Sequence, residues 1–106
     1  MNKIGVDLIG EVNLFENSNR KKPLIKEWWG HANLKGENRK DSYYIYLIDK
    51  DEMNFGERAN AEFKFKFSDD ERFKIKIKEG QILELSSGER KMGEFIIQKI
   101  VNKRLK

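Results

Sequence analysis

His31 is the only histidine of this chain, so a catalytic triad at neutral pH would have to be built around it. Asp41 and Asp49 could orient its imidazole, but no serine lies in the Gly-x-Ser-x-Gly context of a nucleophile elbow. The chain has no cysteine, which excludes disulfides and thiolate metal sites. We therefore expect no catalytic residue and predict that the protein is not an enzyme.

Acidic residues are grouped in two short stretches, from Asp49 to Glu52 and from Asp69 to Glu71. A calcium loop needs alternating oxygen ligands, a central glycine and a distal glutamate, and neither stretch has this spacing. The chain also lacks the Gly-x-x-x-x-Gly-Lys loop that cradles phosphates. We predict solvated turns at both stretches and expect no metal, no cofactor and no bound nucleotide.

A cluster of basic and aromatic residues offers the best candidate site. Its cations could contact phosphate or carboxylate groups, and its rings could stack on a base or anchor a protein interface. Neighbouring residues of a strand face opposite sides, so we expect one tryptophan of the pair to be buried and the other exposed. The exposed indole would be the main contact. The predicted binding residues are Arg20, Lys21, Lys22, Trp28, Trp29 and His31.

A second set of cations occupies alternate positions of two predicted strands. We expect these side chains to keep the outer face of a sheet soluble, because RNA-binding sheets add exposed aromatics among the bases. The residues are Lys64, Lys66, Lys74, Lys76 and Lys78.

The elements that must position these residues are strands. Residues 4–14 alternate apolar and polar side chains, which predicts a long half-buried strand with Asp7 outward and a bend or bulge at Gly10. Residues 59–67 alternate most plainly, with Phe63, Phe65 and Phe67 inward. Further strands are predicted near residues 31–34, 43–48, 73–77, 82–85 and 94–101, and no helix longer than one turn. The pattern predicts an all-β fold, a small closed or partly open antiparallel β-barrel of about six to seven strands.

The composition agrees with one domain over residues 1–106. The charged fraction is 38%, but net charge is only +4 and 11% of residues are aromatic, so a core can form. We expect the basic tail, residues 102–106, to fray. No apolar run reaches membrane length and no signal peptide is visible, so we expect a cytoplasmic protein that does not enter a membrane.

The order of motifs resembles the C-terminal β-barrel of elongation factor Tu and related translational GTPases. The resemblance rests on the Asn19–Pro23 loop, the aromatic pair Trp28–Trp29, the strand ending at Phe67 and the closing run from Gly80 to Gly93. Asn19 stands where the family has a glycine, Gly30-His31 replaces its Arg-Pro pair, and Phe95 stands where it has a second glycine. The GTPase domain is missing from this sequence.

The resemblance implies a freestanding, non-enzymatic module that binds a macromolecule. A protein partner is favoured and RNA is the second possibility; the oligomeric state is not indicated. The alternative is a bacterial immunity or antitoxin-like protein that occludes the site of a toxin. The acidic stretches at 49–52 and 69–71 would then suit a basic nuclease.

Overall fold

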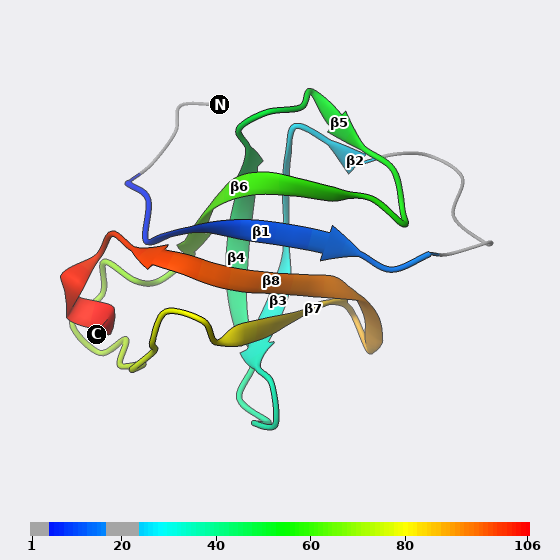
Figure 1. The fold of residues 1–106 in the computed structure, drawn as a ribbon. Coiled ribbons are helices and arrows are strands. Elements are labelled where there is room, and N and C mark those ends of the chain that lie inside the picture. Colours follow the sequence, from blue (N-terminus) through cyan, green and yellow to red (C-terminus); the bar gives the residue numbers. More distant parts are fainter. Residues whose placement is uncertain (1–4, 17–23) are drawn as a thin grey trace.

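Six strands form one antiparallel sheet that closes on itself, and the structure, a computed structural model, describes residues 5–16 and 24–106. The barrel strands are β1 (Leu8–Leu14), β3 (Glu27–Leu34), β4 (Asp41–Leu47), β6 (Arg58–Phe65), β7 (Ile82–Ser87) and β8 (Arg90–Ile100). They pair in the order β1–β6–β4–β3–β7–β8, and β8 returns to β1. In Figure 1, β3 and β4 run behind the other four strands at a steep angle. The predicted all-β barrel is confirmed.

Two short elements complete the fold. β2 (Leu24–Ile25) and β5 (Glu52–Met53) form a separate two-stranded ribbon, at the upper right of Figure 1. The one-turn 3-10 helix η1 (Lys103–Leu105) follows β8. No helix in the described ranges is long and apolar enough to cross a membrane.

The barrel interior is filled by the inward half of each alternating strand, as period-two patterning requires. Phe63 of β6 lies at its centre. Its ring stacks on Tyr43 at 5.0 Å and contacts Phe65 and Phe95, each at 4.9 Å between centroids. These four aromatic side chains are fully buried, so their ring contacts add to the β4–β6 ladder and also connect β6 to β8, with which it shares no ladder.

The predicted irregularity at Gly10 is present. The β1–β8 register shifts between Ile9 and Gly10, and a Cβ atom at Gly10 would collide with the backbone oxygen of Ile96. The same Cβ would lie 2.8 Å from Cζ of Phe95. Glycine is therefore required here by the close approach of β8 and not by an unusual dihedral angle.

Two predicted strands need correction. Residues 73–77 form no ladder, although Phe73 and Ile77 are buried as the alternation predicted. Strand β6 ends at Phe65 because the backbone N–H of Ser68 turns back to the carbonyl of Phe65, at 3.1 Å. Phe67 is consequently 56% exposed, not inward.

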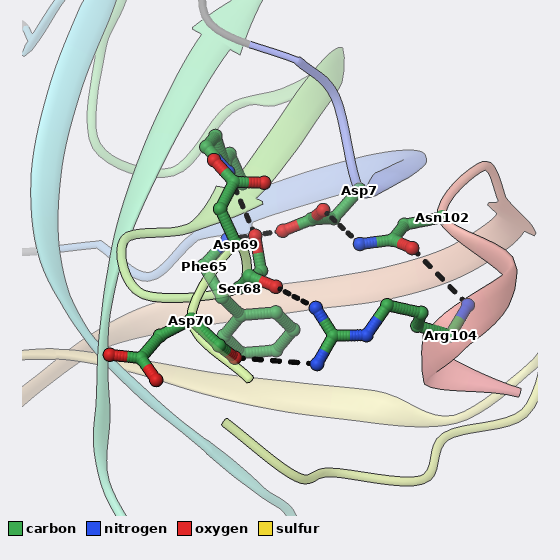
Figure 2. A network of polar contacts seen from close by, with 8 residues as sticks. Asp7, Phe65, Ser68, Asp69, Asp70, Asn102 and Arg104 are labelled. Atoms are coloured by element: carbon green, nitrogen blue, oxygen red, sulfur yellow. Dashed lines mark hydrogen bonds and ion pairs between the residues drawn. The ribbon is translucent and has the colours of Figure 1, made fainter. Parts of the chain in front are cut away.

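Asp7 is buried, whereas the alternation placed it outward. Its Oδ2 accepts a hydrogen bond from the backbone N–H of Phe65 at 2.8 Å, and its Oδ1 accepts one from Asn102 Nδ2 at 2.9 Å (Figure 2). Asp7 therefore joins the start of β1 to the end of β6 and to the chain after β8.

The tail is docked, which overturns the expectation that residues 102–106 fray. Leu105 is buried, and its carbonyl accepts from the backbone N–H of Ile77 at 2.7 Å. The Arg104 guanidinium donates to the carbonyls of Ser68, at 2.8 Å, and Asp70, at 3.3 Å (Figure 2). These contacts provide apolar burial and satisfied carbonyls, which a frayed end lacks.

Candidate contact surface

Trp28 and Trp29 point to opposite sides of β3, as predicted. Trp28 is 8% exposed and donates its Nε1–H to the hydroxyl of Tyr43 at 3.2 Å. Trp29 is 68% exposed. Trp28 is therefore a core residue that cannot touch a partner in this conformation, and the exposed contact residue of the pair is Trp29.

The exposure of Trp29 follows from the register of its strand. On one side it pairs with Tyr44 of β4. On the other side, β7 pairs with β3 only from His31 onward. In the described part of the chain, Trp29 thus has a ladder neighbour on one side only, and its indole projects over the outer surface.

Outward side chains of β4 and of the chain after β6 extend the surface around Trp29. Tyr44 and Ser42 face outward on β4. Lys66, just after β6, lies beside them, because its backbone N–H donates to the Ser42 carbonyl at 2.9 Å. A hollow of about 260 Å³ is lined by Trp29, Ser42, Tyr43, Tyr44 and Lys66.

Two further aromatic rings lie near the same strands. Lys66 Nζ lies 5.4 Å from the ring centroid of Phe67, and Lys26 Nζ lies 5.7 Å from that of Tyr46. Both lysines cover ring faces in cation–π geometry. We call the outward group Trp29, His31, Ser42, Tyr44, Tyr46, Lys66 and Phe67 the Trp29 face.

Charge on and beside the Trp29 face is balanced. Lys64, which we expected to be exposed, is buried, and its Nζ donates to Ser68 Oγ at 2.8 Å and to Asp69 Oδ2 at 3.2 Å. Lys26 forms an ion pair with Asp51 at 3.8 Å. Glu27 stands opposite Tyr46 in the β3–β4 register. Within residues 5–16 and 24–106, the surface thus has aromatic area without a strong positive field.

In the described part of the chain, no hydrogen bond or ion pair engages the imidazole of His31. Its strand neighbours are Ser42 and Ser86, and Ser86 Oγ donates to the backbone carbonyl of His31 at 3.4 Å, not to the imidazole. Its ring meets Trp29 edge-on, with 6.4 Å between centroids. Within residues 5–16 and 24–106, no group of three His, Cys, Asp or Glu side chains is placed to hold a metal ion.

The structure brings only part of the predicted site together. Trp29 and His31 share one face, Trp28 lies beneath it, and Arg20, Lys21 and Lys22 lie outside the described residues. Sequence reasoning missed Tyr44, Tyr46 and Phe67 as surface residues. The outward direction of the two tyrosines could have been predicted, because they alternate along the strand with the apolar residues Tyr43, Ile45 and Leu47. Their position beside Trp29 could not, because it depends on which strands are neighbours in the sheet.

Comparison with known proteins adds no identification. No protein-family model and no curated protein matches the chain.

Proposed function

We propose that this chain is a non-enzymatic, protein-binding β-barrel, a module resembling the C-terminal barrel of translational GTPases, and that it contacts its partner through the Trp29 face. The observation that carries the proposal is Trp29 itself, an indole 68% exposed beside a hollow with an aromatic wall. An exposed tryptophan surrounded by tyrosine and polar side chains has the composition of an interface hot spot.

The charge balance favours protein over RNA at this face. Single-stranded nucleic acid needs a positive groove along its backbone in addition to stacking rings. Lys64 and Lys26 are each paired with an aspartate, which leaves Lys66, among the residues that the structure describes, as the cation beside the hollow. A protein partner can use the rings without that field.

The resemblance to translation-factor barrels supports the fold of the module and its role in binding. A closed barrel serves many functions, so the partner must be inferred from the surface and not from the fold. Toxin occlusion remains the alternative. Three of the carboxylates that would suit a basic nuclease, those of Asp51, Asp69 and Asp70, form ion pairs with Lys26, Lys64 and Arg72 respectively.

Quantitative affinity capture from the native host tests the proposal, using the wild type, Trp29→Ala and Phe15→Ala. Phe15 is the matched control because it is another exposed aromatic, outside the Trp29 face. We expect a protein that the wild type and Phe15→Ala retain, that Trp29→Ala loses, and that survives nuclease treatment. Equal capture by both variants, or loss on nuclease treatment, would contradict a protein-binding Trp29 face. A captured nuclease toxin would favour the alternative.

A further inference from the structure

A strongly basic surface lies away from Trp29, where the segment before β7 meets the chain end. Residues 72–78 and 103–106 contain seven cations and no acidic residue, whereas the whole chain has a net charge of +4. The rest of the chain is therefore net negative. We call these two segments the basic end. The cations are Arg72, Lys74, Lys76, Lys78, Lys103, Arg104 and Lys106.

The two segments are adjacent in space. The backbone N–H of Ile77 bonds to the carbonyl of Leu105 at 2.7 Å, and Lys76 Nζ donates to the carbonyl of Arg104 at 3.2 Å. In Figure 1, the red C-terminal turn lies beside the yellow-green segment that follows β6. The cations of both segments thus belong to one surface.

Burial divides this surface cleanly into an inner and an outer side. The apolar residues Phe73, Ile77 and Leu105 face the core, and the intervening lysines are exposed. The outer side is therefore a row of ammonium groups fixed by a buried apolar anchor.

Four lysine side chains of the basic end make no hydrogen bond or ion pair with the described residues of the chain. Arg72 pairs with Asp70 at 3.0 Å, and this contact lowers the pKa of the Asp70 carboxyl. Arg104 is held by backbone carbonyls. Among the described residues, no hydrogen bond or ion pair engages the side chains of Lys74, Lys78, Lys103 and Lys106. Glu71 and Glu79 border the row.

We propose that the basic end binds nucleic acid through its phosphate backbone, without reading bases. Several unpaired cations on one surface release counterions from a polyanion, which is the usual source of non-specific nucleic-acid affinity. The surface offers no exposed aromatic within its two segments for base stacking. Its apolar residues face inward, so it lacks the side chains that insert into a membrane. This site is separate from the Trp29 face.

The test measures binding by fluorescence anisotropy of labelled nucleic acids. The probes are two single-stranded RNAs of unrelated sequence, each of about 20 nucleotides, and one DNA duplex of the same length. For the wild type we expect micromolar binding near 50 mM salt to at least one of the two nucleic-acid types, with similar affinity for the two RNA sequences. The variant Lys74→Gln/Lys78→Gln/Lys103→Gln/Lys106→Gln should bind at least tenfold more weakly. The slope of log affinity against log salt should fall by about 3, because each lost contact removes about 0.7–0.9.

The control removes the same charge elsewhere, in Lys35→Gln/Lys50→Gln/Arg58→Gln/Arg90→Gln, and should retain the wild-type slope. Trp29→Ala should also retain it, which separates this proposal from the proposed function. Equal losses in both four-residue variants would overturn the proposal in favour of net charge alone. Binding of phosphatidylserine vesicles without binding of either nucleic acid would overturn it in favour of a membrane surface. A large preference for one RNA sequence would contradict backbone recognition.

Discussion

Tyr43 shows how one buried residue links the core to the surface above it. Its ring stacks on Phe63, its hydroxyl accepts from Trp28, and it also lines the hollow beside Trp29. Burial raises the pKa of Tyr43 to about 12, although the Trp28 hydrogen bond lowers it. The hydroxyl is thus neutral in the folded barrel over the ordinary pH range.

This shift predicts a loss of stability at alkaline pH. The unfolded chain ionises Tyr43 near its ordinary pKa of 10 while the folded chain does not, so the free energy of unfolding falls as pH rises above 10. The loss from this group should be about 1.4 kcal/mol at pH 11. It should reach about 2.3 kcal/mol at pH 12.

Urea unfolding of the wild type and Tyr43→Phe at pH 8 and pH 11 measures this loss. At pH 8 the variant should be less stable by about 1 kcal/mol, because Trp28 loses its acceptor. At pH 11 the gap should close, since only the wild type carries the titrating hydroxyl at position 43. The other tyrosines and the lysines are common to both proteins. A gap of the same size at both pH values would contradict the shifted pKa.

At the scale of elements, the β1–β8 seam depends on Gly10. Gly10→Ala should lower the free energy of unfolding by about 1–3 kcal/mol, because the new methyl group meets the Ile96 backbone and the Phe95 ring. Gly5→Ala is the control, since no atom lies within 4 Å of its Cβ position, and should change stability by less than about 0.5 kcal/mol. Chemical denaturation measures both. Equal effects would show that the approach of β8 does not require glycine.

Strands could be predicted from the sequence where alternation coincides with a ladder, as in β1 and β6. Residues 73–77 alternate equally well but form no ladder, because alternation reports that one side of the chain is buried and not that a neighbouring strand is present. The prediction that Phe67 faces inward was wrong for a related reason. The chain turns at Ser68 and leaves the sheet before Phe67 can face the core.

The candidate site could be predicted only in part for the same physical reason. Alternation required Trp28 and Trp29 to face opposite sides. Parity within β3 also indicates which one is buried, because Trp28 shares its side of the strand with Ala32 and Leu34. The groups that lie beside Trp29 depend on the β3–β4 and β3–β7 registers, which no local pattern encodes. The burial of Lys64 could not be predicted either. Its position on the outer face was predictable, but its burial against Ser68 and Asp69 depends on the turn that follows β6.

At the scale of the whole molecule, three distant parts of the chain close one end of the barrel. Asp7 before β1, the end of β6 and the tail after β8 share the hydrogen bonds of Figure 2. Leu105 supplies the apolar contact, at 2% exposure. The tail thus contributes to the stability of the barrel and also holds part of the basic end in place.

This closure predicts that Leu105→Ala destabilises the whole barrel by about 2–5 kcal/mol. Val101→Ala, at a more exposed position just after β8, should cost less than about 1 kcal/mol. Thermal unfolding followed by circular dichroism measures both. Hydrogen exchange at Ile77, whose amide bonds to Leu105, should accelerate in the first variant. A Leu105→Ala protein as stable as the wild type would mean that the tail is dispensable.

The central claim is that the Trp29 face contacts a protein, and isothermal titration of the purified captured partner tests it most directly. Trp29→Ala should weaken binding by about 30-fold or more, the loss expected for a hot-spot residue, and leave stability within about 0.5 kcal/mol of the wild type. Phe15→Ala should bind within about twofold of the wild type, because its ring lies outside the face. Wild-type affinity in Trp29→Ala would contradict the account.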